Sequence, residues 1–472
     1  MDVQLLIFAL YFVLIFFIGW LSLKKTQNEE DYWIAGGKLG WLVGGSTMAA
    51  THTSAGTFIG TIGVIYTAGW SFGWVVLSIP LAYWFMAAVL APRFTRLKQL
   101  TLPAFMEARY DSKGARGVAA VIIVIATVVY IQAQIIAGGL VANTIFGISP
   151  TNGMIIFTII LLVYTVIGGM IAVVYTDFLQ LIIMCLGAVV SVPIALHHFG
   201  GIDNLLGYVE VVRPTSFEWD GGLAPSLLFT LSLAFFLGSV ATPEKVTRLY
   251  AMRDMKTIRK GILFTILVVT IINLLVFILA LGATVLFPNL PNGDLAMPLV
   301  AKTVLPTFIG TLMLAAITSA MMSTVDSLLL VAGAALSEDL FQSLIKPSAT
   351  KQERLRVGRI GIFIVGVIPL FLILSGVGEG ELIQFIVVLF TALMAASFFT
   401  PVVFGVWWKG GTKYGAIASM VGGVVTSLLW KAYGAATIDP VLPGFVVSVV
   451  LYFAVSLMTK KPSDEVIERY FG

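Results

Sequence analysis

The sequence predicts an all-α polytopic membrane protein, and three observations support this fold class. Of the 472 residues, 59% are hydrophobic and only 11% are charged, and the mean hydropathy is +1.00. Apolar runs of about 18 or more residues recur along the chain, each long enough to cross roughly 30 Å of hydrocarbon as a helix. The runs lack the two-residue alternation of a membrane barrel, so helices must satisfy the backbone inside the bilayer.

About 13 apolar runs are present, and each is expected to form one transmembrane helix. The first lacks a basic leading segment and a small-residue cleavage site and is followed by Lys24 and Lys25, so it is expected to be a retained span rather than a signal peptide. The expected spans are residues 3–22, 41–66, 71–92, 117–146, 152–168, 170–197, 226–243, 260–287, 306–337, 358–375, 382–407, 414–430 and 441–459.

The basic residues predict the orientation in the membrane. One alternating set of loops between these spans carries all but Arg213, Lys302 and Lys431 of the 28 Lys and Arg residues. Cytoplasmic loops are enriched in Lys and Arg. We therefore expect a cell membrane protein in contact with lipid, with its amino terminus outside and its carboxyl terminus in the cytoplasm. The oligomeric state is left open.

Two other classes of protein are disfavoured. The formal net charge is +4, but no compact basic domain is present, so a nucleic acid partner is not expected. The three histidines, His52, His197 and His198, are scattered, and Cys185 is the single cysteine. These residues provide neither a zinc cluster nor a nucleophile with its base, so we do not expect an enzyme.

Two spans are interrupted by polar and small residues. The second span contains the patch Ser46–Gly60, and the seventh ends in Gly238-Ser239-Val240-Ala241-Thr242-Pro243. Gly and Pro weaken helices and free backbone carbonyls. Two interrupted helices five spans apart are typical of transporters built from inverted repeats, with ion and solute sites at the breaks. Packing of helices through small residues is the alternative explanation.

Carboxylates inside apolar runs indicate an ion pathway. Asp177 follows the helix-breaking pair Gly168-Gly169, and Asp326 lies deep in the ninth span. Such acids usually face a watery cavity or a cation. Helical periodicity places one set of oxygen-bearing residues on a single face near Asp326, and oxygen ligands suit a small hard cation. That face comprises Ala320, Ser323, Thr324 and Ser327. Hydrogen bonding of these hydroxyls to their own helix remains the alternative.

The residues around Asp177 resemble the sodium/solute symporter family, particularly its bacterial proline and pantothenate members. Residues 168–180 read GGMIAVVYTDFLQ and are similar to that family's signature. Met322-Ser323-Thr324 and Ala55-Gly56-Thr57-Phe58-Ile59-Gly60 match two further stretches of the family. The likeness covers nearly the whole chain.

This resemblance implies the leucine-transporter fold, a 5+5 inverted repeat with one helix before the repeats and two after them. The expected organisation is an extra helix and cytoplasmic loop at residues 1–40, a first repeat at 41–197, an extracellular loop at 198–225, a second repeat at 226–408, and two helices with a cytoplasmic tail at 409–472.

The resemblance also implies sodium sites. The common site carries over as the backbone carbonyls of Ala50, Thr53 and Ala320 with the hydroxyls of Ser323 and Thr324. A second site, present in some members, corresponds to Asp177, Ser323, Asp326 and Ser327. Asp326 replaces a serine of the two-sodium type. One or two sodium ions are therefore expected, because either a second cation binds there or the two acids share a proton.

Positions that shape the solute pocket in the family carry over to His52, Gly56, Thr57, Tyr130, Gln134, Phe235 and Pro243. Val76 falls near the place of a sugar-binding glutamate, which argues against a hexose. His52 is suited to donate a hydrogen bond to a carboxylate or to titrate near neutral pH, although packing alone also explains it.

The expected function is sodium-coupled symport of a small organic solute by alternating access. The preferred solute is a carboxylate or zwitterion, such as pantothenate, a monocarboxylate or proline. Two alternatives remain: a proton-coupled transporter of the same fold that uses His52, Asp177 and Asp326, and a transporter-like sensor that binds solute without net transport.

Overall fold

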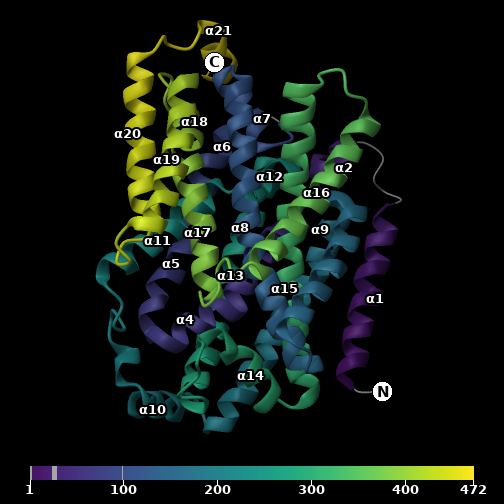
Figure 1. Cartoon of the computed structure of the whole chain (residues 1–472), viewed down its shortest axis with the longest axis vertical. Helices are drawn as coiled ribbons and strands as arrows, with labels where there is room; N and C mark the ends of the chain where they lie inside the picture. Colours follow the sequence, from purple (N-terminus) through teal and green to yellow (C-terminus); the bar gives the residue numbers. More distant parts are fainter. Residues whose placement is uncertain (1–2, 24–28, 98, 472) are drawn as a thin grey trace.

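The computed structural model describes residues 3–23, 29–97 and 99–471, and in these ranges the fold is helical (Figure 1). The described β structure consists of one isolated bridge between Leu39 and Met252. This confirms the all-α class. The principal helices are α1 (Val3–Leu23), α3 (Trp41–His52), α4 (Thr61–Ala68), α5 (Phe72–Phe85), α8 (Lys113–Phe146), α9 (Pro150–Phe199), α11 (Pro225–Ala241), α12 (Pro243–Ala251), α13 (Met255–Leu286), α15 (Thr307–Ala334), α16 (Lys351–Leu374), α17 (Ile383–Met394), α19 (Lys413–Tyr433) and α20 (Val441–Met458).

Short helices connect or cap these elements. They are α2 (Glu29–Ile34), α6 (Ala91–Phe94), α7 (Leu102–Tyr110), α10 (Ile202–Val212), α14 (Ala296–Thr303), α18 (Gly405–Trp407) and α21 (Asp464–Phe471). π-helical segments extend α15 as Ala335–Ile345 and α17 as Ala395–Phe404.

Within the described residues, 11 helical stretches are long and apolar enough to cross a membrane. This number differs from the expected 13 or so because helix breaks shorten or merge some of the expected spans. The 12-residue α3 is too short by itself, Pro150–Val166 is also short, and Gly56–Phe94 joins two expected spans. The number 13 thus stays a prediction.

Helix α9 folds back on itself at Gly169. That residue has φ 67° and ψ 177°, outside the helical region. The hydroxyl of Tyr164 lies 2.5 Å from the hydroxyl of Thr176. In a straight helix, residues 12 apart would be separated by about 18 Å. The two halves of α9 therefore lie against each other, as expected for the separate spans 152–168 and 170–197.

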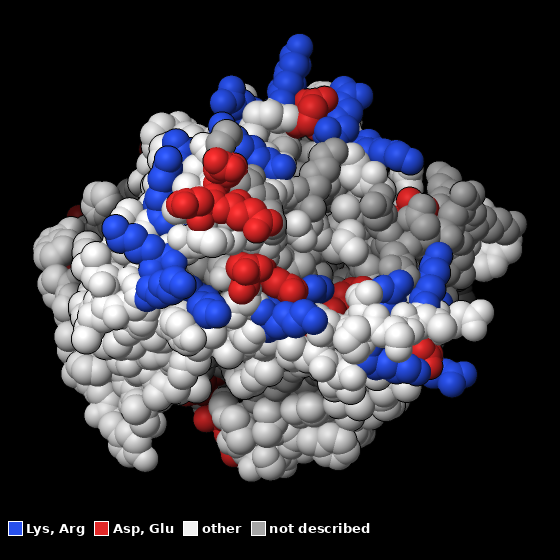
Figure 2. Space-filling view, turned by 90° about the horizontal axis from the view of Figure 1, so that it is seen from above, with Lys and Arg blue, Asp and Glu red and all other residues white. Residues whose placement is uncertain are grey.

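Basic side chains gather at one end of the molecule. Figure 1 places the two termini at opposite ends, and Figure 2 shows many Lys and Arg side chains on the end that carries the carboxyl terminus. This distribution is consistent with the predicted orientation. Lys24, Lys25 and Lys98, three residues of the basic set, lie outside the described residues.

Burial separates a central group of helices from a peripheral one. The stretches Thr307–Ile345 and Ile383–Trp407 are 83% and 94% buried in their most apolar windows, whereas Val3–Ser22 and Val441–Met458 are each 28% buried. The central α15 packs extensively against α9 and also contacts α3. Polar groups held by these inner helices are shielded from lipid, so these helices are the expected location of the functional site.

The seventh span differs from its expected end at Pro243. The chain passes through extended Thr242 and continues as α12 to Ala251, so the apolar stretch runs from Pro225 to Ala251. Pro243 occupies the first position of α12, where its missing N–H costs nothing. Lys245 and Arg248, assigned from the sequence to a loop, are consequently buried in the helix bundle.

Candidate functional site

The interrupted second span presents backbone carbonyls that lack their helical donors. Helix α3 ends at His52, and Thr53 is extended. The N–H of Ser54 donates to Thr57 Oγ1 at 3.4 Å, and the N–H of Ala55 donates to Gln134 Oε1 at 3.0 Å. Continued helix would have directed these two donors to the carbonyls four residues earlier. The break therefore frees the carbonyls of residues 50 and 51.

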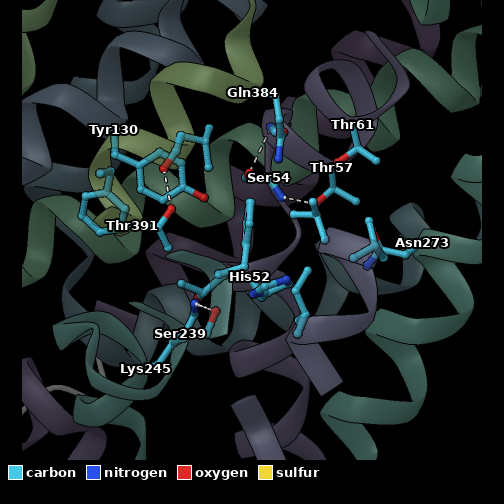
Figure 3. A pocket seen from close by; sticks show the side chains of 18 of the residues that line it. His52, Ser54, Thr57, Thr61, Tyr130, Ser239, Lys245, Asn273, Gln384 and Thr391 are labelled. Carbon is cyan, nitrogen blue, oxygen red and sulfur yellow. Dashed lines mark hydrogen bonds between the residues drawn. The ribbon is translucent and has the colours of Figure 1, made fainter. Parts of the chain in front are cut away.

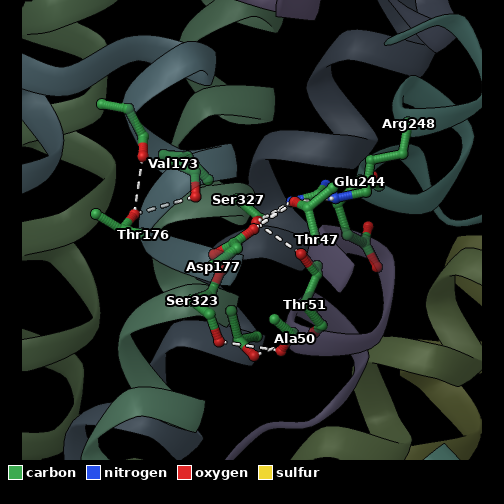
Figure 4. A network of polar contacts seen from close by, with 12 residues as sticks. Thr47, Ala50, Thr51, Val173, Thr176, Asp177, Glu244, Arg248, Ser323 and Ser327 are labelled. Carbon is green, nitrogen blue, oxygen red and sulfur yellow. Dashed lines mark hydrogen bonds and ion pairs between the residues drawn. The ribbon is translucent and has the colours of Figure 1, made fainter. Parts of the chain in front are cut away.

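Helix α15 supplies the groups that meet these carbonyls. Ser323 Oγ lies 3.0 Å from the carbonyl oxygen of Ala50 and 3.2 Å from that of Ala320. Thr324 Oγ1 lies 3.1 Å from the carbonyl oxygen of Thr51. The structure thus joins the break in α3 to the face of α15 that the sequence singled out (Figure 4).

This cluster has the donor chemistry of a sodium site. Ala50, Ala320, Ser323 and Thr324 lie together and are all fully buried, and their neutral oxygens suit a hard monovalent cation. Thr53, whose backbone carbonyl is the fifth expected ligand, sits at the break. Its buried hydroxyl, which was not an expected ligand, has no hydrogen-bond partner among the described residues. The carbonyl of Thr51, which the sequence reading did not include, lies in the same cluster.

Arg248 occupies the region expected for a second cation. Its Nη2 atom lies 3.3 Å from Asp177 Oδ2 and 2.5 Å from Ser327 Oγ, and its Nε donates to Thr47 Oγ1 at 3.0 Å. Thr47 in turn donates to Asp177 Oδ2 at 2.5 Å. Figure 4 shows the guanidinium reaching from α12 into this group. A built-in cation thus stands between two of the predicted ligands.

Asp326 has different partners from Asp177. Its Oδ1 accepts a hydrogen bond from Thr165 in the first half of α9, and its Oδ2 has no partner within the described chain. Ser327, the adjacent residue, faces Arg248 and also lies 2.9 Å from Thr51 Oγ1. Asp177 and Asp326, the two acids of the expected second site, therefore make separate contacts.

A buried cavity adjoins the break in α3 (Figure 3). Its volume is about 30 Å³, which is room for about two water molecules. Five of the seven expected solute-binding residues line it: His52, Gly56, Thr57, Tyr130 and Phe235. This conformation is contracted, so a solute larger than a few atoms requires the walls to move apart.

Two expected solute-binding residues do not line the cavity. Gln134 is fully buried with its side-chain oxygen bound to the N–H of Ala55, so it supports the break in α3 instead. Pro243 is the first residue of α12 and does not line the cavity. Tyr130 stacks on Phe390 with ring centroids 4.5 Å apart, and the pair forms one side of the cavity.

The sequence reading missed several polar residues that line the cavity, among them Ser239, Glu244, Lys245, Asn273, Gln384 and Thr391. Glu244 and Lys245 directly follow Pro243 at the second break, and this position was the available signal. His52 lies beside them, with its ring edge-on to Tyr83 at a centroid distance of 5.5 Å. In Figure 3 Lys245 and His52 lie on one side of the cavity, opposite Gln384 and Thr57.

Asp294 lies outside the membrane-spanning stretches and is bonded to the first residue of α17. Its Oδ2 accepts a hydrogen bond from the N–H of Ile383 at 2.9 Å, while Oδ1 has no partner among described groups. Burial raises the pKa of this carboxyl to about 7, and the Ile383 hydrogen bond opposes the shift. The Asp294 carboxyl in this contact therefore changes its charge near neutral pH.

Comparison with models of protein families assigns the chain to one family. The model of the sodium:solute symporter family matches residues 32–423. The osmoregulated proline transporter OpuE of Bacillus subtilis (strain 168) is 28% identical, with 100% of this chain and 98% of that protein covered. The high-affinity proline transporter PutP of the same strain is 29% identical, with 96% and 98% covered.

Solved structures share the fold. A Na⁺-coupled sialic acid symporter in a substrate-bound outward-open state superimposes with a TM-score of 0.85 at 20% identity, covering 98% of this chain and 99% of that one. Mhp1, a nucleobase-cation-symport-1 family transporter, gives 0.60 at 12% identity, with 94% and 99% covered. The leucine-transporter-like architecture is thereby confirmed.

Proposed function

The chain belongs to the sodium:solute symporter family and performs sodium-coupled symport of a small organic solute; we propose that sodium binds between α3 and α15. The ligands are the carbonyl oxygens of Ala50, Thr53 and Ala320 and the hydroxyls of Ser323 and Thr324. The supporting observation is the 3.0 Å contact between Ser323 Oγ and the carbonyl oxygen of Ala50, across two helices. The carbonyl of Thr51 is a further candidate ligand.

The solute binds in the adjacent cavity and is a small carboxylate or zwitterion. Thr51 connects the two sites, because its carbonyl lies in the ion cluster while the residue also lines the cavity. His52, Gly56 and Thr57 follow it along the break. An ion that fixes this segment also fixes the cavity wall, so sodium and solute strengthen each other's binding by the same factor.

One sodium ion accompanies each solute. The guanidinium of Arg248 already provides a positive charge between Asp177 and Ser327, where a second cation was expected. Asp177 therefore stabilises the junction of α9, α12 and α3 rather than binding sodium. Asp326 Oδ2, which has no hydrogen-bond partner among the described residues, belongs to a different contact and is assigned no ion.

The basic end of the molecule faces the cytoplasm, so sodium enters from the end that carries α10 and α14 (Figure 1). A membrane potential of 100 mV contributes about 2.3 kcal/mol for each charge that crosses. This contribution drives inward movement of a zwitterion with one sodium ion, which carries a net charge of +1. A monocarboxylate with one sodium ion carries no net charge and is driven by the sodium gradient.

Thermal unfolding of the purified protein in NaCl and in KCl at equal ionic strength tests the ion site. Sodium should raise the unfolding temperature of the wild type, and Ser323→Ala should lose most of that increase. Thr318→Val is the matched control, since Thr318 lies on the same helix and its hydroxyl donates to its own backbone at Leu314. Equal stabilisation of Ser323→Ala and wild type by sodium would refute the assignment.

A further inference from the structure

Two charged residues line the cavity, and they are neighbours in sequence. Glu244 and Lys245 stand in the first turn of α12, immediately after the second helix break. Glu244 is 2% exposed and Lys245 is 5% exposed. Burying charged groups is costly unless partners compensate them, so the partners of these two side chains are informative.

The ammonium of Lys245 makes few direct contacts with the protein, although the neighbouring carboxylate of Glu244 compensates part of its charge through space. Nζ donates to Ser239 Oγ at a long 3.3 Å and lies 5.9 Å from the centre of the Tyr83 ring. An ammonium carries three N–H donors, and Lys245 forms no ion pair within the described part of the chain. Unused donors of a buried cation therefore remain at the cavity wall.

Arg248, one turn further along α12, shows the contrast. Its guanidinium is fully buried too, but it is paired with Asp177 and bonded to Thr47 and Ser327. The helix thus carries one cation that the protein neutralises and one that it leaves facing the cavity. A ligand carboxylate would form an ion pair with Lys245 in the way that Asp177 forms one with Arg248.

We propose that Lys245 is the anchor for the carboxylate of the transported solute, and that Glu244 restricts the solute to one carboxylate. This inference rests on the proposed function. Glu244 Oε2 has no hydrogen-bond partner among the described residues. A second carboxylate on the solute would meet this like charge in a buried site, which disfavours it, whereas a hydroxyl or protonated amine on the solute would be accepted.

Neither Glu244 nor Lys245 is among the solute-binding positions that the resemblance to the family implies. The anchor also differs from the ion cluster in its elements, because Lys245 is carried by α12 and the sodium ligands by α3 and α15. Loss of solute binding and loss of sodium binding are therefore separable.

Thermal shift and uptake competition with the full-length protein in NaCl test the anchor. The probes are lactate, pyruvate, proline and pantothenate, compared with lactamide and prolinamide as uncharged analogues and with succinate as a dicarboxylate. At least one monocarboxylate is expected to stabilise the protein, whereas its amide and succinate are not. Binding of an amide as tight as that of its acid, or a response confined to neutral solutes, would overturn the proposal.

Variants of Lys245 give a second test of the anchor. Lys245→Met should weaken carboxylate binding by about 30-fold or more, because a buried charge pair is lost, and Lys245→Arg should restore part of it. Lys260→Met, which changes an exposed lysine of α13, should match the wild type. Sodium alone should still stabilise Lys245→Met, which shows that the variant is folded. Unchanged carboxylate affinity in Lys245→Met would refute the anchor, whereas a wild type insensitive to sodium would instead refute the proposed function.

Discussion

The guanidinium of Arg248 lies 3.3 Å from the carboxylate of Asp177, and both side chains are completely buried. The pair connects α12, which follows the second helix break, to the second half of α9. Thr47 of α3 bonds to both members. The two broken helices are thus tied to the same polar contact, one turn from the proposed ion site.

Removing one member of this pair should destabilise the protein strongly. Arg248→Met leaves a buried carboxylate without its cation, a change that costs about 3–5 kcal/mol in comparable pairs. The double variant Arg248→Met with Asp177→Leu should recover much of the loss, since no uncompensated charge remains. Thermal unfolding in detergent measures both, and a double variant as unstable as the sum of the single changes would contradict the pairing.

The pH dependence of stability should include a contribution from Asp294. Its pKa of about 7 in the folded protein exceeds the ordinary 3.8. The folded state therefore holds a proton that the unfolded chain releases, so stability falls as pH rises from about 4 to about 7 and is level above that range.

Asp294→Asn should remove the contribution of Asp294 to this fall in stability, while keeping an oxygen that accepts from the N–H of Ile383. Unfolding temperatures of the variant and the wild type between pH 5 and pH 8 give the comparison. Asp439→Asn is an informative control, because burial also raises the pKa of Asp439 to about 7 in a different loop. Parallel pH curves for Asp294→Asn and wild type would show that Asp294 does not titrate in this range.

Close approach of α17 to the π-helical segment Gly56–Gly60, which precedes α4, requires glycine at position 60. A Cβ on Gly60 would lie 2.7 Å from Gln384 Oε1 and 2.8 Å from the backbone nitrogen of Gln384. Gly60→Ala should therefore cost about 1–3 kcal/mol of stability and weaken solute binding, because Gln384 lines the cavity.

Gly207→Ala in α10 is the matched control for this change. Nothing lies within 4 Å of a Cβ at Gly207, and alanine favours a helix, so its stability should be unchanged or higher. Equal behaviour of the two variants in thermal unfolding would show that the approach of α17 is not restrictive.

The local features of this protein could be predicted from sequence. Apolar runs determine helices, and the polar patch at residues 46–60 and the Thr242-Pro243 step marked both breaks because Gly and Pro act on their own stretch of backbone. The position of Ser323 against Ala50 followed from the family resemblance, and the structure brings these two residues together.

Charge made the rest hard to predict. Lys245 and Arg248 were assigned to a loop because isolated cations seldom lie inside a membrane helix. Their burial depends on Asp177 and Ser239, which come from other parts of the chain. The contact of Gln134 with the N–H of Ala55 was also not predictable, because this donor is exposed only by the break in α3.

Equilibrium binding of ²²Na⁺ to the purified protein tests the central claim most directly. The account predicts saturation at one ion per chain, displacement by NaCl but not by KCl, and affinity at least about 10-fold lower in Ser323→Ala, because a direct ligand is removed. Saturation at two ions per chain would contradict this account, as would undiminished sodium binding by Ser323→Ala. It would also be contradicted if the protein bound no sodium while a pH gradient drove uptake.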